Sequence, residues 1–260
     1  MILLELKNVT KAFPRRARNK SLFVKKEYIK AVHQINFTIA CGESIGLVGE
    51  SGSGKSTLAK LITKLEPLTS GEICFRGQSI KHKRSQWLYK HIQLVFQDSS
   101  SSLFPKMTIK EILLEPLLNY YPNEKSTWEE SYKKVLRLVN LDESYLSRYP
   151  HQLSGGQKQR VCIAKALVVR PELIIFDESI SSLDQDSQQV IINMLENIKK
   201  QYKLTYLFIS HDLVTTRKFC DRIMVMYDGK LVETIEGKNT NNIKHSYSRV
   251  LFKTLDIIRN

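Results

Sequence analysis

The stretch Gly49–Thr57, GESGSGKST, decides the fold expected of this chain. It fits the pattern GxxxxGK[ST], in which successive backbone N–H groups curl around the phosphates of a nucleotide and glycines let the backbone approach them. Ser44–Val48, just before the loop, has the pattern of a short buried strand. After the loop, apolar side chains recur at helical spacing, at Leu58, Leu61, Ile62 and Leu65. Strand, glycine-rich loop and helix in this order predict a phosphate-binding loop at a helix N-terminus.

The residues of this loop have expected roles. Lys55 is expected to reach the phosphates, and the hydroxyl of Ser56 to ligate magnesium. A chance loop rich in glycine and serine is the alternative, and the flanking strand and helix argue against it. The predicted nucleotide-binding residues of the loop are Gly49, Glu50, Ser51, Gly52, Ser53, Gly54, Lys55, Ser56 and Thr57.

Composition limits the class of protein. The chain has 260 residues, enough for one large α/β domain or for a domain with a subdomain. No apolar run approaches the ~20 residues of a membrane-spanning helix, and the N-terminus lacks the basic start and cleavage site of a secretory signal. The 4 cysteines and 6 histidines are dispersed, so neither disulfides nor a cluster of metal ligands is expected.

Positive charge is unevenly distributed along the chain. The formal net charge is +14, and basic residues crowd residues 11–30 and, less densely, residues 81–90. Such a patch is typical of a surface that binds nucleic acid or an anionic membrane. A solvated basic loop explains the pattern at least as well, because aromatic residues are not interleaved as single-strand binding requires.

Hydrophobic patterning predicts an α/β fold. Residues 3–13 alternate like an edge or half-buried strand, and residues 29–40 alternate again, with a long hairpin loop expected over residues 14–30. Residues 70–80 read as another short strand pair. From residue 173 onward strands and helices alternate, which favours a parallel sheet covered by helices.

A second candidate anion site lies in the middle of the chain. Residues 91–98 read as a buried strand that ends in polar residues, and residues 108–146 are helical in pattern with a polar break. LSGGQ, Leu153–Gln157, then opens a further helix, so that Ser154 and two glycines sit at its N-terminus, where anions bind. A simple capped turn, with Ser154 as N-cap, explains the same residues.

Two adjacent carboxylates follow a strand. LIIFDE, Leu173–Glu178, is an apolar strand that ends in Asp177 and Glu178. Asp177 is placed to hold magnesium, and Glu178 to polarise a water against the γ-phosphate. Gln97 and His211 also follow predicted strands, and parallel sheets bind ligands at the carboxyl ends of their strands. His211 is therefore expected to contact the γ-phosphate.

These motifs together resemble those of the ATP-binding subunits of ABC transporters, over nearly the whole chain. They are GESGSGKST, Gln97, LSGGQ, LIIFDE, SSLD at Ser181–Asp184 and His211, in the family's order. The resemblance implies a P-loop NTPase (RecA-like) α/β fold, a parallel-sheet core with an antiparallel β subdomain and an inserted α-helical subdomain. It implies a single domain over 1–260, divided into core and β subdomain at 1–97 and 160–240, helical subdomain at 98–159 and helical tail at 241–260.

The family resemblance also implies a site shared between two subunits. Phe13 resembles the aromatic residue that stacks on adenine, and Gln97 the glutamine that touches magnesium and senses the membrane partner. In the family, LSGGQ of one subunit closes on the nucleotide held by the phosphate loop of another, and a head-to-tail dimer holds two ATP molecules. The implied residues are Ser154, Gly155, Gly156 and Gln157 for this contact in trans, Ser182, Leu183 and Asp184 for the D-loop, Lys55, Glu178 and His211 for catalysis, and Ser56, Gln97 and Asp177 for Mg²⁺.

A narrower resemblance concerns the transported solute. QDSSSSLFPKMT, Gln97–Thr108, and HSYSRVL, His245–Leu251, are similar to stretches of the peptide and nickel importer group. Phe104 stands where that group usually has Asn, and Ser99 and Ser246 where it has Pro. Oligopeptide and dipeptide members usually continue into a tail with a cysteine cluster, which this sequence lacks. That difference favours the nickel or metal-chelate type, with peptide uptake as the alternative.

The resemblance also implies partners and a location. The partners are a sister ABC ATPase, with which a heterodimer is expected, two transmembrane permease subunits and an extracytoplasmic solute-binding protein. The chain is then peripheral on the cytoplasmic face of the cell membrane, with ATP and Mg²⁺ as its ligands and no nucleic acid.

Three alternatives stay open on the sequence. DNA-repair and chromosome ATPases usually carry a very long coiled coil between phosphate loop and signature, whereas this chain has a compact helical segment. Translation-factor ATPases carry two cassettes, whereas it has one. An export subunit is disfavoured by the pattern of residues 97–108.

Overall fold

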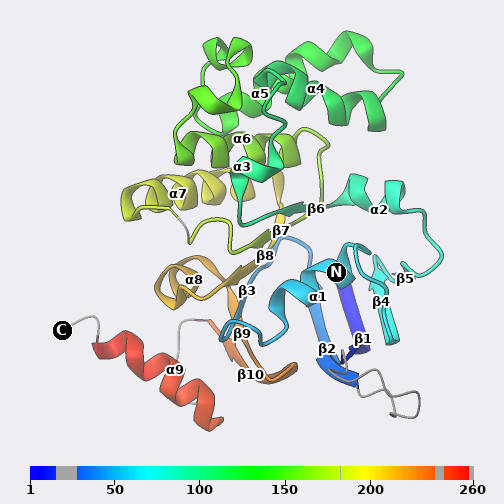
Figure 1. Cartoon of the computed structure of the whole chain (residues 1–260), viewed down its shortest axis with the longest axis vertical. Coiled ribbons are helices and arrows are strands. Elements are labelled where there is room, and N and C mark those ends of the chain that lie inside the picture. The colour runs from blue at the N-terminus through cyan, green and yellow to red at the C-terminus, as the bar shows by residue number, and fades with distance from the viewer. Residues whose placement is uncertain (16–27, 182, 238–242, 258–260) are drawn as a thin grey trace.

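The computed structural model describes residues 1–15, 28–181, 183–237 and 243–257 of the chain. Its centre is a six-stranded sheet with the order β10–β9–β3–β8–β7–β6 (Figure 1). The strands from β9 to β6 pair in parallel, and β10 is antiparallel to β9. Their bounds are β3 Ser44–Val48, β6 Ile92–Val95, β7 Leu173–Asp177, β8 Thr205–Ser210, β9 Arg222–Tyr227 and β10 Lys230–Glu236. The predicted parallel sheet is confirmed.

A second, antiparallel sheet has the order β2–β1–β4–β5. Its strands are β1 Ile2–Pro14, β2 Tyr28–Ala40, β4 Ser70–Phe75 and β5 Gln78–Ser79. Because β1 pairs with both β2 and β4, it is an interior strand; of the two predicted possibilities, an edge or a half-buried strand, the second is correct. Buried and exposed residues both occur along β1, whose pairing is interrupted by bulges, and such partial burial does not distinguish an edge strand from an interior one.

Two sequence predictions need correction. The hairpin loop expected over residues 14–30 is shorter, because strand pairing reaches Pro14 and resumes at Tyr28; residues 16–27 lie outside the described part of the chain. The strand over residues 91–98 is not fully buried. It becomes β6, at one end of the six-stranded order, where only Ile92 and Val95 are fully buried.

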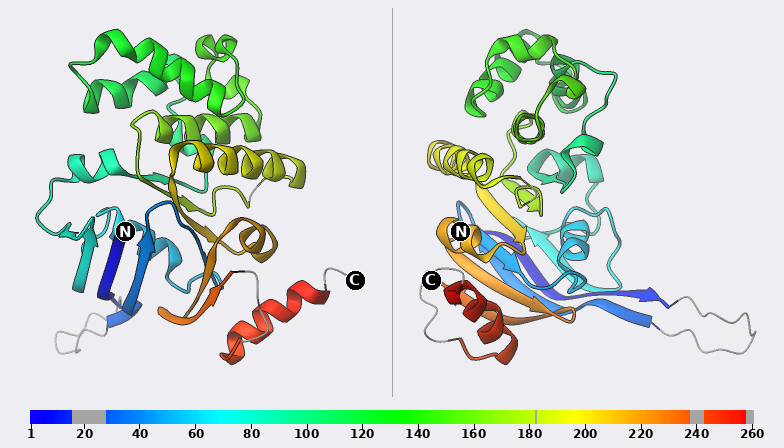
Figure 2. Two further views of the ribbon diagram at one scale, coloured as in Figure 1. Left: turned by 180° about the vertical axis from the view of Figure 1, so that it is seen from behind. Right: turned by 60° about the vertical axis from the view of Figure 1, so that its left-hand side comes forward.

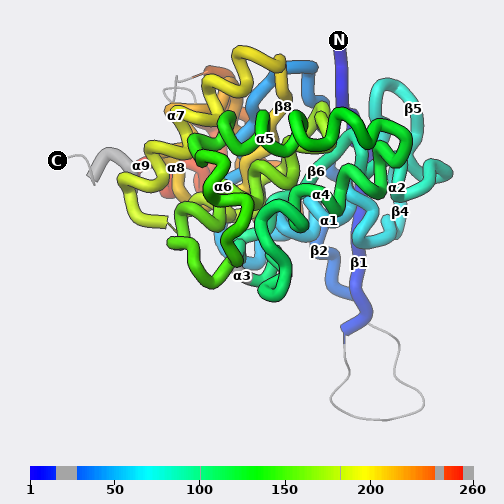
Figure 3. The backbone as a smooth tube through the Cα atoms, turned by 90° about the horizontal axis from the view of Figure 1, so that it is seen from above, coloured from blue at the N-terminus to red at the C-terminus, as the bar shows by residue number. Residues whose placement is uncertain are grey.

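Helices cover both faces of the central sheet. Seen from above, α4, α5 and α6 lie over the sheets, and α9 lies at the other end of the molecule, close to β9 and β10 (Figures 2 and 3). Among the described residues no helix is both long enough and apolar enough to cross a membrane. The helices are α1 Lys55–Ile62, α2 Ser85–His91, α3 Ser99–Ser102, α4 Ile109–Tyr120, α5 Trp128–Leu138, α6 Gly155–Leu167, α7 Gln185–Tyr202, α8 Leu213–Phe219 and α9 Ser246–Ile257, with 3₁₀ turns at Lys125–Thr127, Glu143–Ser147 and Pro150–Gln152.

The two faces of the sheet belong to different hydrophobic cores. Side chains alternate between the faces of a strand, so neighbours on β7 point in opposite directions. Leu173 and Ile175 pack in a core that contains α1 and the antiparallel sheet. Ile174 and Phe176 pack in a second core with α4 to α7. The phosphate-loop helix and the helical layer are therefore held to opposite sides of one sheet.

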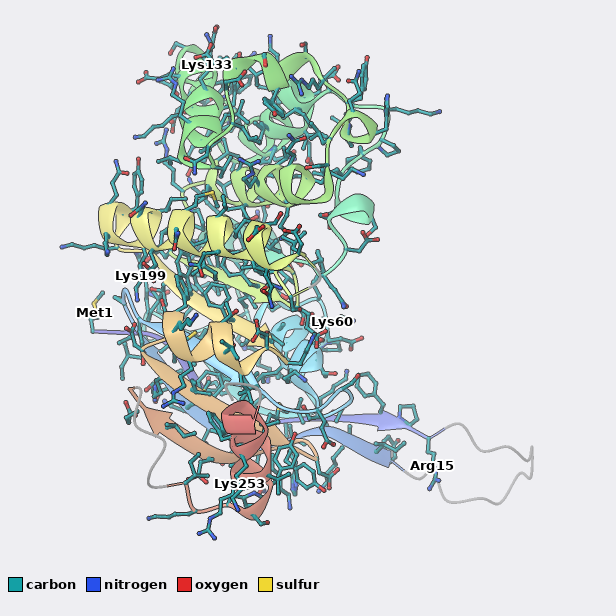
Figure 4. All side chains as sticks on the ribbon, turned by 90° about the vertical axis from the view of Figure 1, so that its left-hand side faces the viewer. Met1, Arg15, Lys60, Lys133, Lys199 and Lys253 are labelled. Atoms are coloured by element: carbon teal, nitrogen blue, oxygen red, sulfur yellow. The ribbon has the colours of Figure 1, made fainter. Side chains whose placement is uncertain are left out.

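The helical layer has its own stabilising contacts. Thr108 begins α4 in a capping box, in which its hydroxyl accepts the Glu111 N–H and the Glu111 carboxylate accepts the Thr108 N–H. Lys133 on α5 lies at the outer end of this layer, and Lys253 on α9 at the opposite end of the molecule (Figure 4). The division of the chain at residues 97 and 159 stays a prediction; α6 runs across the second of these positions.

Candidate nucleotide-binding site

The phosphate loop sits against two other backbone segments. A Cβ atom at Gly49 would lie 2.1 Å from the carbonyl oxygen of Met226, and one at Gly54 would lie 2.1 Å from that of Ala31. Both glycines also have positive φ angles, of 150° and 105°. Side chains at these positions would clash with backbone that cannot yield, so the loop needs glycine at both. α1 begins directly after Gly54 and turns its N-terminus toward the loop.

Lys55 is buried inside this loop. Its side chain is only 4% exposed, and its Nζ donates hydrogen bonds to the carbonyl oxygens of Gly49 and Glu50, each at 2.8 Å. Burial lowers the pKa of this ammonium group, against the opposing effect of the nearby carboxylates of Glu178 and Asp177. A cation held only by backbone carbonyls can exchange them for phosphate oxygens, which are stronger acceptors.

The hydroxyl of Ser56 and the carboxylate of Asp177 meet across the site. Ser56 Oγ donates a hydrogen bond to Asp177 Oδ1 at 2.8 Å. Hydroxyl and carboxylate oxygens are the ligands that Mg²⁺ prefers, so this donor pair fits the predicted magnesium site. The described residues contain no group of three or more His, Cys, Asp or Glu that could hold a metal. A magnesium ion would therefore take the rest of its oxygen ligands from nucleotide phosphates and water.

Glu178 lies where three neighbouring strands end. Gln97 Nε2 is 3.4 Å and His211 Nδ1 is 3.7 Å from the same oxygen, Glu178 Oε2. These residues follow β6, β7 and β8, as the predicted common edge requires. Glu178 has φ of 50°, a left-handed conformation that is uncommon for a residue with a side chain and that is often found at functional sites. The structure thus brings together Glu178, Gln97 and His211 beside Asp177.

The LSGGQ signature is not brought to the phosphate loop of the same chain. Ser154 is the N-cap of α6, where its hydroxyl accepts the Gln157 N–H and the Gln157 side chain accepts the Ser154 N–H. In the part of the chain that the structure describes, no hydrogen bond or ion pair joins residues 154–157 to residues 49–57. The capped turn that the sequence predicted as an alternative, with Ser154 as N-cap, is present. It leaves the outer side of the signature available to another molecule.

The predicted D-loop lies beside the signature. Leu183 is the nearest side chain to the position that a Cβ atom at Gly155 would occupy, at 3.9 Å. Asp184 caps α7 by accepting the Ser187 N–H at 2.9 Å. Ser182, the third predicted D-loop residue, lies outside the described residues.

Phe13 lies on the antiparallel sheet, apart from the catalytic cluster. Its ring is partly exposed, and Lys11 Nζ lies 4.8 Å from the ring centroid. Lys11 is in turn held by Glu66 at 2.8 Å and by the carbonyl oxygen of Pro67 at 2.9 Å. A partly exposed aromatic ring of this kind can stack on a nucleotide base.

One charged residue near the site, Lys60, was not predicted from the sequence. Lys60, on α1, shares with Ser56, Gln97 and Asp177 the lining of an open cleft of about 780 Å³. It reads as an ordinary exposed helix residue, and only the fold places it near Asp177. Its side chain lies on the outer side of α1 (Figure 4).

The sequence from residue 32 to residue 181 matches the family model described as "ABC transporter", and this stretch contains the loop, the signature and both acids. The chain belongs to the ABC transporter family. As a member of this family the chain is an ATPase with a P-loop NTPase fold, as predicted.

Relatives of known name support this membership. The oligopeptide transport ATP-binding protein AppF of Bacillus subtilis (strain 168) is 41% identical over 99% of this chain and 79% of the relative. The nickel import ATP-binding protein NikE of Shigella boydii serotype 4 is 43% identical over 81% of this chain and 80% of the relative. Both solute classes expected from the sequence thus occur among similar ABC ATPases.

Solved structures agree on the fold. The dimeric post-hydrolysis state of the ATP-binding cassette MJ0796, bound to ADP and Pi, is 29% identical, with a TM-score of 0.76 over 90% of this chain and 98% of that chain. The structure of cbiO1 from Clostridium perfringens, 24% identical, has a TM-score of 0.78 over 99% of this chain and 93% of that chain. The second likeness concerns the fold of the ABC cassette alone.

Replacing Asp177 by Asn is expected to stabilise the nucleotide-free ABC ATPase and to weaken its use of magnesium. Asp177 is 8% exposed, and burial raises the pKa of its carboxyl group despite the Ser56 hydrogen bond. A raised carboxyl pKa means that the folded state binds a proton more tightly than the unfolded state, so stability falls as pH rises from about 4 through the folded pKa. We expect Asp177→Asn to raise the melting temperature by a few degrees at pH 7, with the gain shrinking toward pH 4.

The matched control for this experiment is Asp142→Asn. Asp142 is exposed and accepts the Ser144 N–H, and hydrogen bonding from Ser144, first from its side chain and then from its backbone N–H, lowers the pKa of the Asp142 carboxyl group. Its replacement should not raise the melting temperature at any pH. Calorimetry of both variants between pH 4 and pH 8, without nucleotide, makes the measurement. A melting temperature of Asp177→Asn below that of the unmodified chain at pH 7 would contradict the prediction.

Proposed function

We propose that this chain is the ATP-hydrolysing subunit of an ABC importer of the peptide and nickel group. The observation that carries the proposal is the meeting of Gln97, Glu178 and His211 at one edge of the sheet, beside Ser56 and Asp177. That arrangement provides phosphate binding, a magnesium site and a base for water in one place. Phosphoryl transfer needs little more than such positioning and charge stabilisation.

The chemistry is divided among these side chains. Lys55 leaves the backbone carbonyls and holds the phosphates, and Ser56, Gln97 and Asp177 would hold Mg²⁺. A magnesium ion supplies positive charge that neutralises the phosphates as the bond to the leaving group breaks. Glu178 orients the attacking water and accepts its proton, Gln97 and His211 lie against its carboxylate, and His211 contacts the γ-phosphate.

The site is completed by another subunit. Ser154, Gly155, Gly156 and Gln157 of one subunit contact the ATP on the phosphate loop of a second, and Leu183 and Asp184 accompany them. The supporting observation is that, among the described residues, no hydrogen bond or ion pair joins the signature to the phosphate loop of its own chain. A sister ABC ATPase is the proposed partner, so the isolated chain hydrolyses ATP slowly.

The cleft beside Gln97 is the proposed contact with the membrane partners. It lies between α1, β6, α4 and α6, and its far wall carries the ion pair of Glu115 with Lys165 at 3.0 Å. Phe104, 57% exposed, lies near this wall, with Lys165 Nζ 5.6 Å from its ring centroid. A cleft with an exposed aromatic rim suits a helical segment of a permease subunit. Two permeases and an extracytoplasmic binding protein complete the importer, which places this chain peripherally at the cytoplasmic face of the membrane.

The proposed solute is an oligopeptide. The similar ATPase aligned over 99% of this chain is named for oligopeptide transport, whereas the one named for nickel import aligns over 81%. Nickel or a metal chelate is the second candidate, and the higher identity of that alignment, 43% against 41%, supports it.

Uptake measurements separate the two solutes. A cell lacking this chain and complemented with it should accumulate a labelled tetrapeptide, and complementation with Lys55→Ala should abolish that uptake because the phosphates lose their cation. The control is Lys200→Ala, an exposed lysine on α7. If the chain restored uptake of ⁶³Ni²⁺ but not of the peptide, nickel and not an oligopeptide would be the solute. Restoration of either by Lys55→Ala would contradict the proposed role of the chain.

A further inference from the structure

The C-terminal stretch His245–Leu251, HSYSRVL, has no part in the function described so far. It forms the first turns of α9, which is docked on the sheet through Phe252, only 5% exposed. Phe252 belongs to a small hydrophobic core that also contains Val48 and Val225. Val48 is the last residue of β3, directly before the phosphate loop, so α9 shares a core with the base of the loop.

Tyr247 reaches the phosphate loop itself. Its hydroxyl oxygen accepts a hydrogen bond from the backbone N–H of Glu50 at 2.8 Å. Its ring lies against the ring of Tyr227, with the centroids 4.4 Å apart. Burial raises the pKa of the Tyr247 phenol, so the hydroxyl stays protonated and neutral near pH 7. This side chain therefore connects the C-terminal helix to the second residue of the loop.

The position of Tyr247 is fixed by its surroundings. Glu233, on β10, accepts hydrogen bonds from the backbone N–H groups of Lys244 and His245, at 3.0 and 2.7 Å. A carboxylate at the start of a helix satisfies N–H groups that have no partner within the helix. The start of α9 is thus tied to the central sheet immediately before Tyr247.

Lys55 and Tyr247 hold the same peptide unit from opposite sides. The peptide bond between Gly49 and Glu50 is trans, so its C=O and N–H groups point in opposite directions. The C=O accepts Lys55 Nζ at 2.8 Å, and the N–H donates to Tyr247 at 2.8 Å. When Lys55 turns to a phosphate, the described contacts leave Tyr247 as the side chain that anchors this peptide unit.

We propose that Tyr247 is a positioning residue for the phosphate loop, which keeps the peptide unit between Gly49 and Glu50 oriented when Lys55 moves from its carbonyl oxygen to the nucleotide. The inference rests on the proposed role of Lys55. It connects α9 to the nucleotide site through the hydrogen bond between Tyr247 and Glu50. Because coupling between two sites is reciprocal, ATP must in turn stabilise the start of α9.

The test compares Tyr247→Phe with Tyr227→Phe in the full chain. Each variant removes one hydroxyl from the same pair of contacting rings and keeps both rings, but of the two tyrosines only Tyr247 accepts the Glu50 N–H. We expect Tyr247→Phe to raise the Kd for MgATP about three- to ten-fold, the effect of one neutral hydrogen bond. Tyr227→Phe should leave it unchanged. Binding of adenosine, which has no phosphates, should be unaffected in both.

Hydrogen exchange adds a readout that a merely structural role would not change. ATP should slow amide exchange over residues 246–252 in the unmodified chain and should not do so in Tyr247→Phe. A Kd of Tyr247→Phe within about twofold of Tyr227→Phe would overturn the inference. The Lys55→Ala variant tests the proposed function separately from the role of Tyr247. If Lys55→Ala binds MgATP as tightly as the unmodified chain, the proposed role of Lys55 is wrong, whatever the result for Tyr247→Phe.

Discussion

Glu178→Gln is expected to lower ATP hydrolysis by the assembled transporter by a factor of about 10²–10⁴ while ATP binding is retained. Glutamine has the size of glutamate and can keep the contact with Gln97, but it cannot accept the proton of the attacking water. The substitution also removes a negative charge beside Asp177, whose carboxyl pKa is raised by burial and, to a smaller extent, by the charge of Glu178. ATP should therefore bind at least as tightly as before, and the nucleotide-bound dimer should accumulate.

Single-turnover hydrolysis of radiolabelled ATP and equilibrium filter binding make the measurement. The control is Glu130→Gln, which makes the same change at an exposed position on α5. It should hydrolyse ATP at the unmodified rate. Single-turnover hydrolysis by Glu178→Gln at the rate of the Glu130 variant would show that another group activates the water.

Ser154→Arg is expected to abolish hydrolysis at the nucleotide site of the partner subunit and to leave nucleotide binding to its own phosphate loop intact. A bulky cation at the start of α6 blocks the approach of the signature to the ATP held by the other subunit. The substitution also removes an N-cap, which costs about 1 kcal/mol of stability. ATPase activity should fall in the assembled complex, whereas the Kd of the isolated chain for ATP should not change.

Thr108→Arg provides the matched control for the lost cap. Thr108 begins α4 in the same kind of capping box, with Glu111 in the place that Gln157 has in α6. Both variants should lower the melting temperature of the isolated chain by about 2–4 °C. If Ser154→Arg kept full ATPase activity in the complex, or if Thr108→Arg lost as much, a signature acting in trans would be wrong.

Sequence patterns predicted the parts of the fold that depend on short-range order. The strand–loop–helix unit and the strand that begins at Leu173 are present as predicted, although α1 ends at Ile62 and leaves Leu65 outside the helix and exposed, and β7 ends at Asp177. Gln97, Glu178 and His211 also meet as expected, because each follows a strand of one parallel sheet. Such predictions succeed because the direction of a parallel strand determines the edge at which its last residue lies.

Other features could not be predicted because they depend on pairing between distant segments. The alternation of residues 3–13 is compatible with one strand partner or two, and only the assembled sheet shows that β1 has two. Tyr247 is almost 200 residues from Glu50, and nothing in either local sequence signals their contact. The roles of Ser154 and its neighbours depend on a second subunit, so they remain predictions.

The alternation of β7 between two cores has a consequence for how this chain can change. Odd-numbered residues of the strand face α1, and Asp177 continues that series toward Ser56; Glu178 takes the next position and meets Gln97 and His211 instead. Adding or removing one residue within the strand would turn each acid to the opposite face, whereas replacing one apolar residue by another would not. The strand β7 thus tolerates apolar substitutions but not a change in its length.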